Sequence, residues 1–284
     1  MLVGLRIVIG VVVFRLKKLE MANLAAALAI ALALRLGFID VGVRLAFAFA
    51  LNIVVYLNND YIDVELDLNS TNKDTSKSSY LAQHLRAAFW AQVVLVVLLS
   101  AGALAYDAGL LFPIIVGGGI CWWYSAILKR RPFWDIIAMM IWGLAMPMCG
   151  SPVERTLGWC LAAQLGLFSG VFESIQVMRD ADADAAQADV RTTGVVLGKL
   201  RTLMLARVIM VTCTAYAALV MDWRAAVVSA GALVIPFTPQ DVAKYWTRVK
   251  LVYGVTWLVI CAVVFLQQRS SGLVWAVDAA SMLR

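Results

Sequence analysis

The sequence has little of the material from which most soluble metal and redox sites are built. Only one of its 284 residues is histidine, His84, and its five cysteines lie inside apolar segments without the spacing of metal ligands. A histidine-rich metal site and a zinc-binding cysteine motif are therefore excluded. Charged residues make up only 15% of the chain, and the basic ones flank apolar segments instead of forming one stripe. The net charge of +6 therefore does not indicate a nucleic-acid-binding protein.

Apolar sequence, by contrast, fills most of the chain. Hydrophobic residues make up 63% of it and the mean hydropathy is +0.85, far from the balance of a soluble domain. The apolar segments are each close to the roughly 20 residues that a helix needs to cross hydrocarbon. They are residues 19–38, 41–57, 87–106, 108–128, 133–149, 157–178, 201–221, 224–238 and 250–268. The sequence thus predicts an all-α integral membrane protein with about nine transmembrane helices. No repeat or domain boundary interrupts it, which predicts a single domain over residues 1–284.

A further apolar stretch, Leu2–Phe14, precedes these segments. It is similar to the core of a signal peptide, but no small-residue cleavage site follows it before the basic run that begins at Arg15. We therefore expect an interfacial helix or a leading half-helix.

The positions of lysine and arginine predict the orientation in the membrane. With the N-terminus in the cytoplasm and nine crossings, 18 of the 24 basic residues fall on the inner side. Those on the outer side are Arg35, Arg44, Arg155, Arg224, Arg269 and Arg284. This asymmetry favours a cytoplasmic N-terminus.

A run of acids, Asn59–Asp67, stands at the end of the second apolar segment. At about 100° per residue, a helix places most of its polar side chains on one face, while Glu65 points the other way. The face comprises Asp67, Asp63, Asp60, Asn59, Tyr56 and Asn52, from the surface inward. Carboxylates packed this closely repel one another, and Mg²⁺, which takes one or two carboxylates and bridges to phosphates, would remove that cost. The alternative is a solvated acidic helix end.

A second acidic run favours the magnesium site over the solvated helix end. Asp180 and Asp184 lie four residues apart at the end of another apolar segment, and Asp182 faces the opposite side. Gln176 and Glu173 continue the Asp180 face into the apolar part of that segment. Two acidic helix ends of this kind indicate two metal sites around one diphosphate.

Glu173 lies about two turns inside its apolar segment. An ionisable side chain at such a depth is by default a functional-site candidate. The alternative is a structural ion pair with a neighbouring helix.

Cations also stand near the acids. The polar stretch 68–83 carries Lys73 and Lys77, which could reach a diphosphate if this loop forms a lid; otherwise the stretch is a solvated linker. Lys129, at the end of the 108–128 segment, is a candidate anion ligand as well as part of a basic cytoplasmic turn.

At these residues the chain resembles the UbiA superfamily of intramembrane prenyltransferases. The first motif of that family, Asn-Asp-x-x-Asp-x-x-x-Asp, is matched by Asn59, Asp60, Asp63 and Asp67. The second, Asp-x-x-x-Asp followed by a basic-Ser/Thr-Thr stretch and Leu/Phe-Gly, is similar to Asp180, Asp184, Arg191-Thr192-Thr193 and Leu197-Gly198. The family's fourth helix ends in a Tyr-Ser/Pro-x-x-Lys-type sequence, which resembles Tyr124-Ser125 with Lys129. The family also has an acid seven residues before its second motif, often after an aromatic residue, which resembles Phe172-Glu173.

Two stretches depart from the family pattern. The loop after the first motif usually carries Arg/Lys-Pro, whereas this chain has Lys73-Asp74-Thr75-Ser76-Lys77. A glycine usual after the second motif is replaced by Gln187-Ala188-Asp189. These departures bear on the diphosphate contacts and on the choice of substrate.

The resemblance implies a helical bundle around a central cavity that opens to the cytoplasmic side. Mg²⁺ would be held by Asn59, Asp63, Asp67, Asp180 and Asp184, with Asp60 in support. A prenyl diphosphate would be bound by Lys73, Lys77, Lys129 and Ser125.

The same resemblance implies how the prenyl group would react. The prenyl cation and the acceptor would meet in a pocket lined by Asn52, Tyr56 and Gln176, near Tyr124, because aromatic faces favour cations. Glu173 would orient a lipophilic or aromatic acceptor or take its proton. Membrane lipid is the surrounding partner.

Three other functions remain open from the residues. A terpene cyclase on the same scaffold would use prenyl diphosphate without an acceptor. A cation-coupled transporter would carry acids near the middle of the membrane and internal repeats, whereas most acids here are expected at the cytoplasmic face. A non-catalytic scaffold would not explain two acidic stripes.

Overall fold

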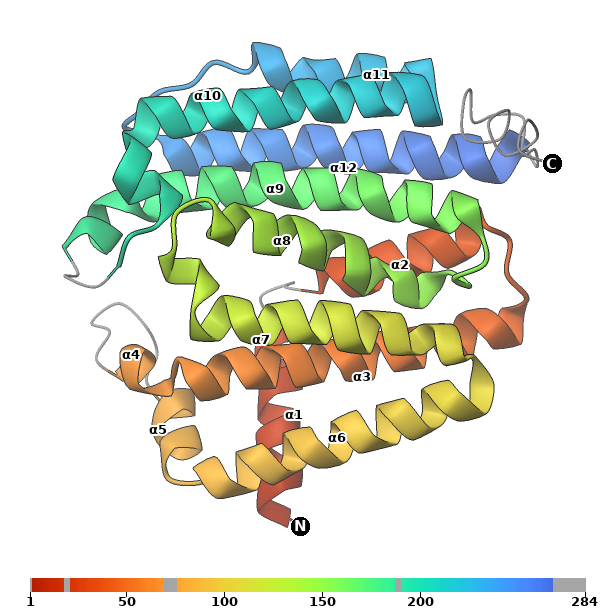
Figure 1. Cartoon of the computed structure of the whole chain (residues 1–284), viewed down its shortest axis with the longest axis vertical. Coiled ribbons are helices and arrows are strands. Elements are labelled where there is room, and N and C mark those ends of the chain that lie inside the picture. Colours follow the sequence, from red (N-terminus) through yellow and green to blue (C-terminus); the bar gives the residue numbers. More distant parts are fainter. Residues whose placement is uncertain (1, 18–20, 69–75, 187–189, 268–284) are drawn as a thin grey trace.

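The computed structural model describes residues 2–17, 21–68, 76–186 and 190–267, and every regular element in these ranges is a helix. Most of the helices run side by side along one direction (Figure 1). The long ones are α3 (Phe38–Ile62), α6 (Leu85–Tyr106), α9 (Thr156–Ala185), α10 (Thr193–Tyr216) and α12 (Val242–Gln267). Shorter ones between them are α2 (Ala22–Ala33), α7 (Gly119–Ala126), α8 (Trp134–Ala145) and α11 (Trp223–Ala230).

Short elements complete these helices or join them. α4 (Val64–Leu68) and α5 (Ser76–Ala82) follow α3. Two π-helices, η2 (Pro113–Gly118) and η5 (Ala217–Met221), continue into α7 and out of α10. The 3₁₀ turns are η1 (Ala108–Leu110), η3 (Leu128–Arg130), η4 (Met146–Gly150) and η6 (Gly231–Val234).

Six helical stretches of the described chain are long and apolar enough to cross a membrane. They are Phe38–Ile62, Leu85–Tyr106, Ala108–Ala126, Thr156–Ala185, Thr193–Met221 and Val242–Leu266. Three shorter apolar helices, Ala22–Ala33, Trp134–Gly150 and Trp223–Val234, occupy the other predicted segments. Large apolar side chains such as Leu104, Val234 and Leu258 face outward. The predicted all-α membrane architecture is therefore confirmed, with six helices of spanning length.

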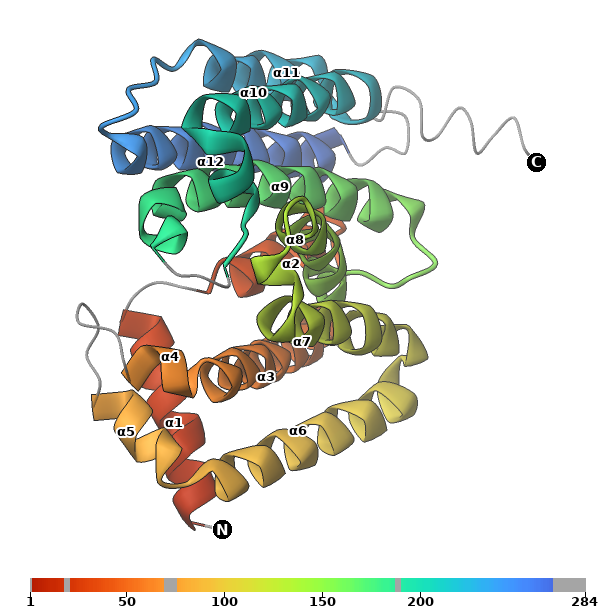
Figure 2. The ribbon, with the colours of Figure 1, turned by 60° about the vertical axis from the view of Figure 1, so that its left-hand side comes forward.

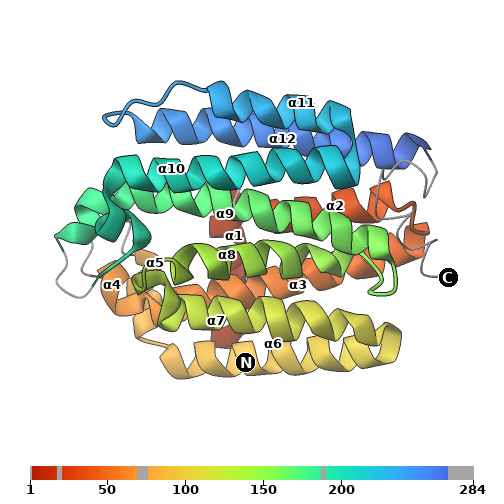
Figure 3. The same ribbon diagram turned by 45° about the horizontal axis from the view of Figure 1, so that its top comes forward.

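Helix α1 (Leu2–Lys17) runs across α3 and α6 instead of along them (Figures 1 to 3). Its buried side chains Ile7 and Val11 belong to a cluster with Leu57 of α3 and Ala88 of α6. The opposite side of α1 remains exposed, including Leu5 and Ile9.

Three elements that carry predicted site residues end at the same end of the bundle. The C-terminal ends of α3, α7 and α9 all lie on the left in Figure 1, beside α4. Figure 3 shows the same arrangement from another side. The two acidic runs are therefore brought to one end of the molecule, although Asp67 and Asp180 are 113 positions apart in sequence.

The periodicity of the first acidic run predicted one continuous helix, but the structure divides the run between two helices. α3 ends at Ile62, and Asp63 caps it with φ −88° and ψ 2° while its backbone N–H still donates to the Asn59 carbonyl at 2.9 Å. α4 then begins at Val64. The chain therefore bends within the motif, and a single helical face accounts only for its first part.

Candidate active site

The end of α3 presents its polar side chains to partners from α1, from α7 and from the η3 turn. Asn59 accepts a hydrogen bond through Oδ1 from the Ser125 hydroxyl at 3.0 Å. Asp60, which is 7% exposed, accepts from Arg15 of α1 at 2.7 Å. Asp63 forms an ion pair with Lys129. Each of these three side chains is therefore held by a donor. A bound cation could take the place of that donor, and a bound anion could draw the donor away.

The end of α7 contacts both acidic stripes. Ser125 and Lys129 reach the α3 side, as described above, while the hydroxyl of Tyr124 donates to Glu173 Oε1 on α9 at 2.8 Å. This geometry follows from local structure: α7 ends at Ala126, and the η3 turn directs Lys129 back toward Asp63. Three predicted site residues thus join the two runs of acids.

The end of α9 carries the second stripe. Glu173 is 3% exposed, and its Oε2 makes no hydrogen bond with any residue in the described ranges. Asp180 is paired with the neighbouring Arg179 at 2.7 Å, and Asp184 accepts from the Thr192 hydroxyl at 3.3 Å. Asp182 pairs with Lys199 of α10 at 2.6 Å and is largely exposed. The face predicted for Asp182 is thus distinct from that of Asp180.

Asp135 is a buried acid that no sequence motif marked. It stands in the first turn of α8 with no solvent exposure. Its carboxylate accepts from the backbone N–H of Thr193 at 2.7 Å, from the Thr193 hydroxyl and from the backbone N–H of Ile136. Its place at the start of an apolar segment, after Phe133 and Trp134, is the one signal that could have revealed it.

The Asp135–Thr193 contacts hold the start of α10 to α8, and the start of α10 also packs closely against α9. A side chain at Gly194 would collide with the Val177 carbonyl of α9, so only glycine allows the two helices to approach so closely. Thr192, the N-cap of α10, accepts from the backbone N–H of Val195 and donates to Asp184. Asp135 therefore fixes the segment that contacts the second acidic run.

The predicted pocket residues lie along the two stripes. Asn52 is fully buried on α3; its amide donates to the Ala48 carbonyl at 2.7 Å, and its Oδ1 accepts nothing within the described chain. Tyr56 is half-buried, with the Arg15 guanidinium 4.4 Å from its ring centre. Gln176 is half-buried on α9, one turn beyond Glu173.

Three predicted residues cannot be placed in the same way. Lys73 lies outside the described residues. Asp67 and Lys77 fall within α4 and α5, but their side chains are not among those described. Their roles stay predictions.

The donor set suits a hard cation such as Mg²⁺, because it consists of carboxylate and amide oxygens. Within the described ranges, no three acidic, cysteine or histidine side chains lie close enough to enclose a metal ion directly. Mg²⁺ takes only one or two carboxylates and keeps several waters, so separate carboxylates at the two helix ends fit this ion. Donors of this kind can hold a polyanion between metal ions and the Lys129 ammonium.

Comparison with known proteins identifies the family. The sequence profile of the UbiA prenyltransferase family matches residues 21–271, most of the chain. The chain belongs to the UbiA prenyltransferase family. The resemblance stated from the two acidic motifs is thereby confirmed, and together with the six spanning helices it makes the chain a multi-pass membrane protein.

Solved structures show the same fold. A structure of digeranylgeranylglyceryl phosphate synthase in membranes has a TM-score of 0.72 at 14% identity, over 92% of this chain and 99% of that one. A UbiA homologue from Archaeoglobus fulgidus, bound to DMAPP and Mg²⁺, has a TM-score of 0.58 at 15% identity, over 84% of each chain. The homologue bound to GPP and Mg²⁺ has a TM-score of 0.58 at 14% identity, over 93% and 92%. Among curated proteins, the sequence comparison finds no match.

Proposed function

We propose that this member of the UbiA family is an Mg²⁺-dependent intramembrane prenyltransferase. It would ionise a prenyl diphosphate and transfer the prenyl group to a lipophilic or aromatic acceptor. The observation that carries the proposal is the end of α7 together with the η3 turn that follows it. Here Ser125 contacts Asn59, Lys129 contacts Asp63, and Tyr124 contacts Glu173. This end links a polyanion site at the surface to a buried carboxylate deeper in the bundle.

The metal site would be formed by the oxygens of both helix ends. Its ligands would be Asn59, Asp63, Asp67, Asp180 and Asp184, with Asp60 in support. When bound, Mg²⁺ neutralises charge on the leaving diphosphate. The two Archaeoglobus fulgidus structures, bound to Mg²⁺ with DMAPP or GPP, support this assignment.

The chain's own cations would serve the diphosphate. Lys129 is paired with Asp63 in the structure, and a diphosphate at this end would draw its ammonium away from that carboxylate. Ser125 would donate to a phosphate oxygen in place of Asn59. Lys73 and Lys77 would approach from the loop after the first motif. These donors stabilise negative charge as the C–O bond of the substrate breaks.

Glu173 and Tyr124 would act on the acceptor. Glu173 lies seven residues before Asp180, about 10 Å deeper along α9 at 1.5 Å per residue. The Tyr124 hydroxyl donates to Oε1 of the Glu173 carboxylate and leaves Oε2 for the acceptor. Oε2 would orient the acceptor, or it would take the proton that the acceptor loses when the acceptor's nucleophilic atom bonds to the prenyl carbon. Tyr56 and Tyr124 would face the allylic cation, whose charge their rings favour.

A cavity inside the membrane suits this reaction. Asn52 and Gln176 would line the space between the acids and the buried part of the two stripes. Apolar surroundings accept the prenyl chain and keep water from quenching the cation. The proposal includes a single domain over residues 1–284, nine crossings, a cytoplasmic N-terminus and a cytoplasmic mouth. The distribution of basic residues supports this orientation.

The test is product analysis with the purified protein in liposomes. We expect labelled prenyl diphosphate and Mg²⁺ to yield a prenylated product only when an aromatic or lipophilic acceptor is added. Formation of a cyclic hydrocarbon without an acceptor would show that the protein is a terpene cyclase and not a transferase. Release of no diphosphate under any condition would overturn both.

A further inference from the structure

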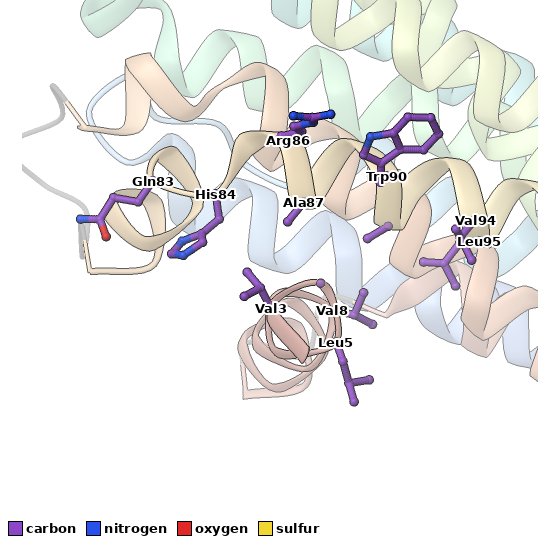
Figure 4. Close-up of a pocket in the computed structure, with 12 residues that line it drawn as sticks. Val3, Leu5, Val8, Gln83, His84, Arg86, Ala87, Trp90, Val94 and Leu95 are labelled. Atoms are coloured by element: carbon purple, nitrogen blue, oxygen red, sulfur yellow. The ribbon is translucent and has the colours of Figure 1, made fainter. Parts of the chain in front are cut away.

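A groove lies on the outside of the bundle, between α1 and the first half of α6 (Figure 4). Its volume is about 750 Å³, within the range of roughly 300–1,000 Å³ usual for small-molecule sites. The α1 wall consists of Val3, Gly4, Leu5 and Val8. None of these residues belongs to the proposed active site.

The groove is polar at one end and apolar along the rest. Gln83, His84 and Arg86 lie at the end where α6 begins, which is the end of the bundle that carries the acidic runs. Further along α6 the wall consists of Ala87, Trp90, Ala91, Val94 and Leu95. From Arg86 to Leu95 the groove extends about 13 Å along the helix, at 1.5 Å per residue. Such a shape fits a ligand with a polar head at the membrane surface and an apolar chain below it.

The helices that line or adjoin the polar end carry cations but no acids. Helices α1, α5 and α6 contain no aspartate or glutamate. Arg86 is exposed and makes no ion pair within the described part of the chain. Arg6 of α1 lies 4.6 Å over the ring of Tyr80, which in turn packs against the ring of His84 at 4.4 Å. A ligand whose head complements the charge at this end of the groove therefore has an anionic head.

The apolar part of the groove, away from its polar end, is open to the surrounding membrane. Leu5, Trp90 and Val94 are each more than half exposed, at 57%, 54% and 53%. The occupant is thus a molecule that already lies beside the bundle in the bilayer. A prenyl diphosphate held by metal ions does not fit, because the three helices offer no carboxylate to a metal.

We propose that this groove binds an anionic phospholipid, with its phosphate at Arg86 and one acyl chain along Trp90, Val94 and Leu95. Apolar burial of the chain supplies affinity for any phospholipid. The cation selects the headgroup, because a basic residue near an anionic lipid surface contributes about 1 kcal/mol, or about a fivefold preference.

The test measures lipid binding directly, without enzymatic activity. Delipidated protein in detergent is titrated with palmitoyl-oleoyl phosphatidylglycerol or with the matching phosphatidylcholine, and bound lipid is counted by native mass spectrometry. We expect the wild type to prefer phosphatidylglycerol about fivefold. Arg86→Gln should abolish the preference while it leaves binding of phosphatidylcholine unchanged. The matched control is Arg248→Gln, which removes an exposed cation of α12 at the same end of the bundle and should change nothing.

A second variant tests the acyl chain. Val94→Trp fills the apolar part of the groove from an exposed position and should weaken binding of both lipids. Size-exclusion chromatography and circular dichroism establish that the variants are folded. The proposal is overturned if Arg86→Gln keeps the phosphatidylglycerol preference, or if Val94→Trp binds both lipids as the wild type does. It is equally overturned if farnesyl diphosphate in EDTA displaces the phosphatidylglycerol at equal concentration.

Discussion

The two ends of the helical bundle both place carboxylates beside cations, but they hold them in different ways. At the end opposite the proposed active site, Arg44 is 3% exposed and pairs with both Asp40, at 2.8 Å, and Asp107. Asp107 also accepts from the backbone N–H of Gly109 at 2.8 Å, and the hydroxyl of Tyr106 donates to Asp40 at 2.5 Å. Each of the two carboxylates therefore has a second partner besides the buried Arg44 guanidinium.

At the active-site end, long side chains or hydroxyls of neighbouring segments hold the acids. Lys129 holds Asp63, Arg179 holds Asp180, and Thr192 holds Asp184. An ammonium, a part-exposed guanidinium or a hydroxyl on a flexible side chain can leave a carboxylate when a metal ion or a phosphate arrives. We infer that the ion pairs of the Arg44 cluster are structural, whereas the carboxylates at the active-site end exchange their partners.

Replacing Arg44 should have the largest effect on stability. Arg44→Met leaves two partly buried carboxylates without their cation, which we expect to cost about 3–5 kcal/mol. Thermal unfolding of the detergent-solubilised protein measures this loss. Turnover per folded molecule should stay at the wild-type level.

A compensated variant serves as the control for Arg44. Adding Asp40→Asn and Asp107→Asn to Arg44→Met removes the uncompensated charge and should recover most of the lost stability. An unchanged melting temperature in Arg44→Met, or a fall in turnover at constant stability, would show that this end is not a structural clamp.

Replacing the acids of the other end should affect turnover instead. Asp63→Asn and Asp180→Asn should each lower the rate of product formation by about 10²–10³, the size of the loss when one group that stabilises developing charge is removed. The double variant should be no slower than either single one, because parts of one catalytic unit are not additive. Steady-state rates and melting temperatures are measured on the same preparations.

Asp182→Asn is the matched control for Asp180→Asn. Asp182 lies on the same helix but is exposed and paired with Lys199, and an exposed pair of this kind contributes about 0–1 kcal/mol. We expect turnover close to that of the wild type. Equal losses in the two variants would mean that the second acidic run does not act through one helical face.

Replacing Glu173 should separate binding from transfer. Glu173→Gln keeps an acceptor for the Tyr124 hydroxyl but cannot take a proton, so we expect a loss of about 10² in transfer, at the low end of general-base contributions. Affinity for a non-hydrolysable prenyl diphosphate analogue should stay within about twofold of the wild type. A joint collapse of affinity and melting temperature would make Glu173 a structural residue. No change in either would favour cyclisation without an acceptor.

Replacing Asp135 should have the smallest effect of the four. Asp135→Asn turns one acceptor oxygen into a donor that faces the Thr193 N–H or hydroxyl, and a buried polar group left unsatisfied costs about 1–3 kcal/mol. We expect lower thermal stability and a modest loss of turnover, since Thr192 and the second acidic run would shift. Faster proteolysis between α9 and α10 would locate the change. Unaltered stability would mean that Asp135 does not clamp this segment.

The sequence predicted the parts of this molecule that depend on local periodicity. The apolar segments correspond to helices, and the spacing of Asp180, Asp182 and Asp184 correctly separated two faces of α9. The bend at Asp63 was not predicted, because a helix end that stays within a polar run has no compositional signal. The two acidic motifs indicated the family by their residue types and spacing, since both are local features of the chain.

Contacts between distant residues could not be predicted in the same way. Asp135 and Thr193 are 58 positions apart, and Arg44 and Asp107 are 63 apart. Each pair depends on how helices pack, which no single segment encodes. Tyr124 and Glu173 were both predicted as site residues, but their hydrogen bond across 49 positions emerged only from the fold.

The release of diphosphate from a labelled prenyl diphosphate, in the presence of an acceptor, tests the central claim most directly. The protein in liposomes is assayed first in excess EDTA and then after excess Mg²⁺ is added back. If the two acidic helix ends form one Mg²⁺-dependent site, release is absent in EDTA and returns with Mg²⁺ in the wild type, but not in Asp63→Asn. Full release in the chelator would contradict the account.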